Sequence, residues 1–261
     1  MPLSVETAGH VAVITIDNPP LNLFPDEYMD ELRRAVDGFA VDDDVRVAII
    51  TGAGTRAFTA GKDVTAHKLA ADPERENPRA VRNYIQALVD SAVPIIAAVN
   101  GVCLGHGIAI AASADIVLAS TNARFGLPEI NIGSGNGQRL LREMFPRGHA
   151  RHAFYTGEYI DAEEAYRLGA VFQLYEPDEL MAEAHKLAGT IAAKSPSMIR
   201  MFKDTVRWTE YLDMQTGYRF EGESWQALKR TPRGAAEMLE AKQSFFEKRA
   251  PRFGRTSPPV S

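Results

Sequence analysis

Two unbroken apolar runs constrain the fold of this chain more than any other feature. Residues 45–51 read VRVAIIT, in which VAII is unbroken, residues 95–100 read IIAAVN, in which IIAAV is unbroken, and a glycine follows each segment. A strand with one solvent-facing side alternates apolar and polar residues, whereas a strand buried on both faces is apolar throughout. The two runs therefore predict central strands of a parallel sheet that is covered on both faces.

Strand and helix patterns alternate through the first half of the chain. Residues 10–17 (HVAVITID) and 116–119 favour strands. Apolar residues recur at three- and four-residue steps after Pro25, which predicts a helix with Asp26 and Glu27 at the positive end of its dipole. The other expected helices cover residues 77–92, 106–114, 136–145, 148–155, 161–168, 178–194, 197–210, 213–229 and 232–248. Mixed elements early and helices alone beyond about residue 135 predict an α/β core with a helical C-terminal part.

Composition excludes several classes of protein. The chain has 261 residues, 45% of them hydrophobic, and 29 basic against 34 acidic residues give a net charge of −5. Such a chain buries a large core and has no general attraction for nucleic acid or an anionic membrane. The single cysteine, Cys103, forms no intrachain disulfide, and the first residues lack the pattern of a signal peptide. We expect a cytoplasmic protein with no nucleic-acid or membrane partner.

Several common site motifs fail on single residues. Ala60-Gly61-Lys62 resembles the end of a phosphate-binding loop, but Arg56 and Asp63 stand where that motif needs glycine and serine or threonine. Ile110 replaces the third glycine of a dinucleotide fingerprint. No carboxylate or cysteine follows His149 and His152 at metal-ligand spacing, so we expect no metal.

Three segments remain as candidates for chemistry. Residues 58–64 and 100–107 are glycine-containing loops that follow predicted strands. Backbone N–H groups in such loops can converge on an oxyanion, although ordinary turn packing is the favoured explanation of each loop taken singly. Glu129 lies among apolar residues beside a glycine-rich stretch, where desolvation would raise its pKa toward that of a general base; a surface glutamate in a turn is the alternative.

Together with the segments around them, these residues resemble the enoyl-CoA hydratase/isomerase, or crotonase, superfamily. The resemblance rests on segments that follow one another in family order and cover nearly the whole chain: NPPLNLF, VRVAIITGAGTRAFTAGKDV, PIIAAVNGVCLGHGIAIAASADIVLASTNARFGLPEINIG, QRLLREMF, TGEYIDAEEAYRLGAV, AAKSPSMIRMFK and FFEKRAPRF. The family fold implies an α/β spiral of ββα units in residues 1–195 and a helical trimerisation region in residues 196–250. Residues 251–261 would form a flexible tail. Trimers in this family often pair into hexamers, and apolar surface for assembly is expected from Phe202, Trp208, Phe220, Trp225, Phe245 and Phe246.

The resemblance also implies roles for individual residues. The two oxyanion-hole amides fall on the backbone N–H groups of Lys62 and His106, and the catalytic carboxylate falls on Glu129. Ala60, Lys62 and Val64 match the loop whose backbone faces the adenine of coenzyme A. Lys248, at the end of the last helix, is a further candidate for contact with coenzyme A, or else a solvated helix end.

Two departures from the family pattern bear on the reaction. Hydratases of this family use a second glutamate, and its position is Ala109 here. The loop after Glu129 is also shortened to residues 134–137. His106 replaces a usual glycine, so its imidazole is either a second acid/base or, as we favour, a packing group.

These features favour a double-bond isomerase that needs only Glu129 and an oxyanion hole. The alternatives are a hydratase with an atypical water site, another CoA-thioester lyase or decarboxylase, and a non-catalytic acyl-CoA-binding, scaffolding or RNA-binding relative. The expected partners are an acyl-CoA thioester and further copies of the chain, with no cofactor beyond the coenzyme A of the substrate. The acyl end would be shaped by residues 67–82.

Overall fold

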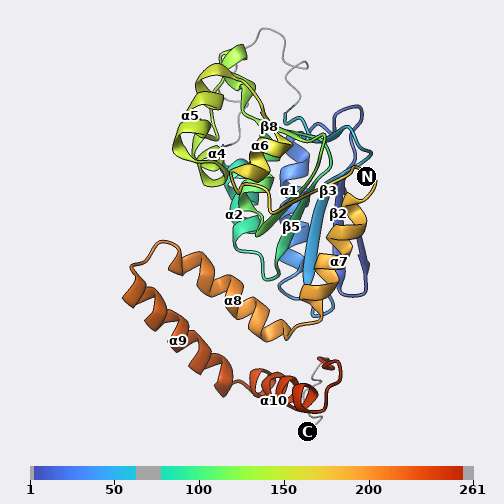
Figure 1. Cartoon of the computed structure of the whole chain (residues 1–261), viewed down its shortest axis with the longest axis vertical. Helices are drawn as coiled ribbons and strands as arrows, with labels where there is room; N and C mark the ends of the chain where they lie inside the picture. The colour runs from blue at the N-terminus through green and yellow to red at the C-terminus, as the bar shows by residue number, and fades with distance from the viewer. Residues whose placement is uncertain (1–2, 63–77, 255–261) are drawn as a thin grey trace.

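The computed structural model describes residues 3–62 and 78–254, which form an α/β core that carries a helical arm (Figure 1). The larger sheet has six strands in the spatial order β1-β2-β3-β5-β7-β10. Their bounds are β1 (Leu3–Ala8), β2 (Val11–Ile16), β3 (Val47–Gly52), β5 (Ile95–Val99), β7 (Ile116–Ser120) and β10 (Gln173–Tyr175). The smaller sheet has the order β4-β6-β8-β9, with β4 (Ala57–Thr59), β6 (Val102–Leu104), β8 (Arg124–Gly126) and β9 (Ile160–Asp161).

The described part of the chain also contains ten α-helices and one 3₁₀ helix. Their bounds are α1 (Asp26–Gly38), α2 (Pro78–Val89), α3 (His106–Ser113), the 3₁₀ helix η3 (Pro128–Ile132), α4 (Gln138–Met144), α5 (Arg147–Thr156), α6 (Ala162–Arg167), α7 (Leu180–Ala192), α8 (Pro196–Thr209), α9 (Met214–Arg230) and α10 (Pro232–Phe246).

The larger sheet is buried on both faces, as the two apolar runs predict. In β3, Val47 and Ile49 pack toward α7, whereas Ala48 and Ile50 belong to the main core on the opposite face. Strands β2, β3, β5 and β7 pair in parallel, so helices must connect them. Long buried strands thus form a rigid platform for the loops that follow them.

The fold class is confirmed, but several elements differ from the sequence-based prediction. Residues 3–8 form β1, which pairs antiparallel with β2 and was not predicted. The expectation of helices alone beyond residue 135 is wrong, because β9 and β10 each add a short strand to a sheet. Strands of two or three residues carry no measurable period, so a pattern search misses them.

The smaller sheet determines where the candidate site lies. Strands β4, β6 and β8 run parallel, with Thr59 opposite Cys103 and Leu104 opposite Gly126. Parallel strands end at the same edge of a sheet. The loops that follow these three strands therefore meet there.

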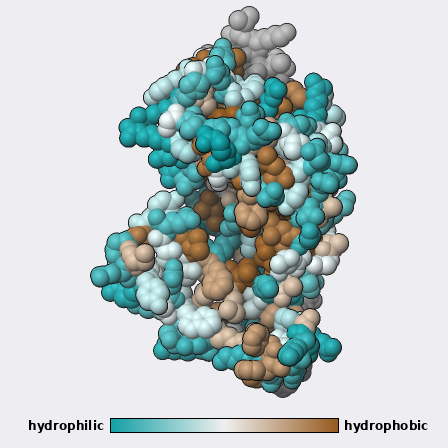
Figure 2. Space-filling model, viewed as in Figure 1, coloured by the Kyte–Doolittle hydropathy of each residue, from teal (hydrophilic) through white to brown (hydrophobic). Residues whose placement is uncertain are grey.

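The arm consists of α8, α9 and α10, which extend away from the core (Figure 1). The base of the arm is fixed by Glu237 of α10, whose carboxylate is buried. This carboxylate accepts hydrogen bonds from Ser195 Oγ at 2.5 Å, the Ser197 amide at 3.0 Å and Arg233 Nε at 2.9 Å. Figure 2 shows the surface hollowed between the core and the arm, with hydrophobic residues gathered along this recess.

The first residues of the predicted tail turn back toward the core. Arg46, at the start of the platform, donates hydrogen bonds to the carbonyl oxygens of Ala192 at 3.1 Å and Phe253 at 2.5 Å. Arg252 donates its amide to Glu240 at 2.6 Å. Across residues 3–62 and 78–254, no helix combines the length and the apolar character needed to cross a bilayer.

Candidate active site

Three residues predicted from the sequence come together at one edge of the smaller sheet. Lys62 follows β4, His106 follows β6, and Glu129 follows β8, each by two or three residues. Because the three strands are parallel neighbours, their loops bring these residues to a common point.

Two glycines allow the loops to approach closely. Gly61 has φ +85°, and a methyl group built there would lie 3.1 Å from the Leu104 carbonyl oxygen and 3.5 Å from the His106 nitrogen. Gly105 has φ +54°, and its methyl group would lie 2.8 Å from Glu129 Oε1. Both backbone conformations are disfavoured for residues with a side chain. The two loops and the Glu129 carboxyl are therefore in direct contact.

The backbone N–H groups of Lys62 and His106 are available as donors. His106 begins α3, and the first turn of an α-helix leaves its amides without intrahelical partners. Among the residues that the structure describes, neither amide donates to a protein acceptor. Two such amides on touching loops, one of them at a helix N-terminus, are the arrangement that holds developing negative charge on an oxygen.

Glu129 lies in the first turn of η3 and is the carboxylate of this edge. Its Oε2 atom is buried and, within the described residues, has no hydrogen-bond partner. Burial raises the pKa of Glu129, and a backbone hydrogen bond partly opposes that rise. A desolvated carboxylate beside a pair of free amides is suited to removing and returning a proton.

The His106 ring points into the protein, among buried aromatic side chains. Its centroid lies 5.4 Å from that of Phe24 and 5.7 Å from that of Tyr84, and its Nδ1 atom is 2.7 Å from the Tyr84 hydroxyl. Burial, reinforced by the positive charge of Lys62, lowers the pKa of His106 to about 4. A neutral imidazole in this position fits the packing role favoured above.

The Lys62 side chain also turns away from the loop edge. Its Nζ atom lies 3.1 Å from Asp26 Oδ1 at the start of α1. The Gly61 carbonyl oxygen accepts a hydrogen bond from the Phe24 amide at 2.8 Å. Lys62 and His106 thus leave their backbone amides at the site while their side chains contact neighbouring elements.

The remaining predicted residues have different positions. Ala60 is held by a hydrogen bond from its amide to the Leu21 carbonyl oxygen at 3.0 Å. Val64 and most of the acyl-end segment 67–82 lie outside the described residues. Lys248 follows α10, at the opposite end of the molecule from β8 (Figure 1), so the subunit does not bring it to this edge. Its contact with coenzyme A stays a prediction.

Position 109 and the loop after η3 fit the departures noted in the sequence. Ala109 is buried in α3, one turn after His106. Its methyl group can neither hold nor activate a water. Residues 133–137 include two left-handed glycines, and Ser134 donates its amide to the Glu129 carbonyl oxygen at 3.0 Å. This short turn stabilises the backbone that carries the carboxylate.

Sequence reasoning missed Tyr84 and Phe24, which surround the His106 ring. Both are fully buried, and their apolar spacing on the chain looks like ordinary core. The unusual imidazole at position 106 was the signal that a buried partner had to exist, but nothing in the sequence identified which residue it was.

Comparison with known proteins extends over nearly the whole chain. Residues 6–256 match the family model described as enoyl-CoA hydratase/isomerase. A short-chain-enoyl-CoA hydratase of Clostridium acetobutylicum is 35% identical over 94% of each chain. A carnitinyl-CoA dehydratase of Proteus mirabilis is 34% identical over 96% of this chain and 97% of its own. The structure of Pseudomonas aeruginosa DspI superposes with a TM-score of 0.89 at 31% identity, covering 97% of each chain.

Proposed function

The chain belongs to the enoyl-CoA hydratase/isomerase family, and from that premise we propose that it processes an acyl-CoA thioester by proton transfer through Glu129. The reaction that fits one carboxylate best is movement of a carbon–carbon double bond. The observation that carries this proposal is the pairing of Glu129, whose Oε2 atom is buried and has no partner among residues 3–62 and 78–254, with an alanine at position 109.

Isomerisation would use one base twice. The Glu129 carboxylate removes a proton from C2 of a 3-enoyl-CoA, and the electrons of that bond move onto the thioester oxygen. The Lys62 and His106 amides hold the resulting dienolate; the loss of one such donor typically costs about 10²–10³ in rate. The protonated Glu129 then returns the proton to C4, which leaves a 2-enoyl-CoA and restores the carboxylate.

Hydration or dehydration is the second candidate, because the names of several relatives favour it. Those relatives include a hydratase and a dehydratase at 34–35% identity. The chain would then need another group to hold water in place of the glutamate absent at position 109. The short turn at residues 134–137 is the candidate for that role.

The decisive experiment compares two substrates with the unmodified protein. Crotonyl-CoA reports hydration, and a 3-enoyl-CoA reports isomerisation, with products identified by mass spectrometry in ¹⁸O-labelled water. We expect measurable conversion of the 3-enoyl thioester and weak hydration. Rapid hydration of crotonyl-CoA without isomerisation would overturn the isomerase proposal.

Ala109→Glu tests the role of the missing carboxylate. We expect the new glutamate to raise hydration of crotonyl-CoA, and Ala109→Gln, which has the same size without the charge, to leave it weak. A carboxylate buried at this position also loses hydration, so Ala109→Glu should lower the midpoint of thermal unfolding. Equal hydration by both variants would argue against a water-binding role at position 109.

We also propose that the arm binds further copies of the chain, as a trimer or a pair of trimers. Support comes from the exposed side chains of Phe202, Trp208, Phe245 and Phe246, which are 47–79% accessible in the single subunit. Phe220 and Trp225 are half-buried and add less surface.

A further inference from the structure

Three aromatic rings from separate elements form a closed cluster behind the oxyanion loops. Phe24 precedes α1, Tyr84 belongs to α2, and His106 begins α3. Phe24 and Tyr84 are fully buried, and their centroids lie 5.8 Å apart. The His106 ring completes the triangle. Every ring is thus in contact with the other two.

The hydrogen bond in this cluster has a defined direction. Burial raises the pKa of Tyr84 and lowers the pKa of His106 to about 4, so both groups are neutral near pH 7. Within the described residues, His106 Nδ1 is the partner of the Tyr84 hydroxyl, at 2.7 Å. Because a buried phenol with one partner loses a hydrogen bond unless it donates, we assign the O–H group as the donor to Nδ1 and place the imidazole proton on Nε2.

The backbone next to His106 needs such an anchor. Gly105 precedes it with φ +54° and ψ −110°, a conformation in which the glycine places little restraint on the following peptide plane. The direction of the His106 N–H bond depends on that plane. A side chain held by ring contacts with Phe24 and Tyr84 and by a hydrogen bond at Nδ1 restrains the Cα–Cβ bond and hence the amide.

We propose that Tyr84 is a positioning residue for the oxyanion hole, which acts through the His106 imidazole to aim the His106 amide at the thioester oxygen. The inference rests on the proposed function, because it assigns that amide to the reacting oxygen. Tyr84 itself does not touch the substrate in this account. Its hydroxyl holds the His106 side chain in one position through the hydrogen bond to Nδ1.

The test uses variants that change one atom group at a time. Tyr84→Phe removes the hydroxyl and keeps the ring. His106→Asn keeps a hydrogen-bonding atom near the position of Nδ1, whereas His106→Gln places its amide near the position of Nε2. Tyr28→Phe is the matched control, because Tyr28 is buried against Phe24 at 5.6 Å and makes no hydroxyl hydrogen bond within the described residues.

Two readouts separate positioning from general stability. The first is kcat against KM for whichever enoyl-CoA the wild-type protein converts. The second is the near-ultraviolet absorbance of bound acetoacetyl-CoA at a fixed pH, since a site that stabilises an oxyanion raises the fraction of this thioester that is present as its enolate. We expect Tyr84→Phe to lower kcat about fivefold, the equivalent of about one hydrogen bond, with KM changed less than twofold and a weaker enolate signal.

The remaining variants extend the same expectation. His106→Gln should behave like Tyr84→Phe, His106→Asn should retain most of the wild-type signal, and Tyr28→Phe should retain all of it. The double variant Tyr84→Phe/His106→Gln should lose no more than either single variant, because both remove one interaction.

Three results would overturn the inference. They are wild-type kcat and enolate absorbance in Tyr84→Phe, additive losses in the double variant, and the absence of an enolate signal in the wild-type protein. If the wild-type protein converts no enoyl-CoA but binds acetoacetyl-CoA as its enolate, the proposed reaction fails. The Tyr84 comparison is then still decided by the absorbance alone.

Discussion

The core and the arm of this protein are stabilised in different ways. In the described residues, buried aliphatic and aromatic side chains, proline aside, run from Leu3 to Ala192, and none follows. The three arm helices instead expose large apolar side chains, among them Trp208 at 55% and Phe246 at 79%. Buried apolar packing in the described residues is therefore confined to the core, whereas the arm presents its large apolar side chains outward.

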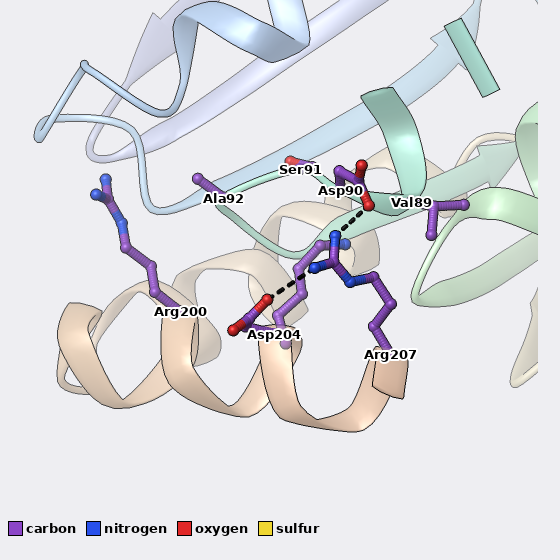
Figure 3. A pocket seen from close by; sticks show the side chains of 8 residues that line it. Val89, Asp90, Ser91, Ala92, Arg200, Asp204 and Arg207 are labelled. Carbon is purple, nitrogen blue, oxygen red and sulfur yellow. Dashed lines mark hydrogen bonds and ion pairs between the residues drawn. The ribbon is translucent and has the colours of Figure 1, made fainter. Parts of the chain in front are cut away.

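Charge, rather than apolar packing, holds the arm to the core. Four ion pairs make the connection: Arg207 with Asp90, Lys203 with Asp115 at 2.6 Å, Arg200 with Asp43 at 3.7 Å, and Arg233 with Asp43 at 2.8 Å. A cavity of about 210 Å³ lies between α8 and the turn after α2 (Figure 3). These ion pairs beside a cavity indicate that charged contacts set the position of α8 on the core. The apolar face of α8 then remains available for contact with another surface.

The sharpest difference between the two regions is expected in stability. Phe145→Ala removes a buried core ring and should lower the free energy of unfolding by about 3–5 kcal/mol. Phe246→Ala removes an exposed ring of the arm and should change it by less than about 0.5 kcal/mol. Urea unfolding measures the change in both variants. It is carried out at a protein concentration where sedimentation detects a single oligomeric species. Similar losses would mean that the arm has a core of its own.

The chemistry should depend on the core alone. Glu129→Gln should lower turnover at least about 10²-fold, the usual contribution of a general acid/base, while acyl-CoA affinity and assembly stay unchanged. Near-wild-type turnover would remove Glu129 from the mechanism.

The pH dependence of the wild-type protein and of Glu129→Gln refines this prediction. Because burial raises the pKa of Glu129, turnover should fall as pH drops through that raised pKa. His106, with a pKa of about 4, is neutral above pH 5 and contributes nothing to the pH dependence of turnover there. A raised folded-state pKa also means that the ionised carboxylate costs stability at neutral pH and not below the unfolded-state pKa. Glu129→Gln should therefore unfold at a higher temperature than the wild-type protein at pH 7, but not at pH 4.

Assembly should depend on the arm alone. Trp208→Glu places a charge on its exposed face and should weaken self-association by about 30-fold or more, as expected for an aromatic hot spot. Tyr166→Glu is the matched control, since Tyr166 is 47% exposed on the core. Sedimentation velocity across a concentration series compares the two. A wild-type protein that is monomeric at micromolar concentration would contradict the proposed trimer.

The smallest effect is expected where the two regions touch. Arg207 contacts Asp90 and also Asp204 of its own helix, at 2.9 Å for the latter pair (Figure 3). A double-mutant cycle of Arg207→Met and Asp90→Asn should give a coupling of about 0.2–1 kcal/mol, typical of a partly exposed pair. Coupling above that range would make this ion pair a main attachment of the arm.

The sequence predicted the long elements well and the short ones poorly. The runs at residues 45–51 and 95–100 are apolar enough to identify strands buried on both faces, and apolar spacing located the long helices. Strands β4, β6 and β8 have three residues each, too few for a period, yet they bring Lys62, His106 and Glu129 together. The residue pattern singled out Glu129 and the two loops, whereas resemblance to a family assigned the oxyanion-hole amides to Lys62 and His106. The Tyr84–His106 hydrogen bond was out of reach because it depends on how α2 packs against α3.

The end of the buried apolar set at Ala192 has a consequence for how the molecule is made. A ribosome releases the chain from its N-terminus, and domains generally fold in that order during synthesis. All three residues that meet at the edge of the smaller sheet, and the whole buried core, precede the arm in the chain. The arm therefore emerges after every residue of the buried apolar core. In the proposed assembly, an error in joining copies need not be an error in folding a single one.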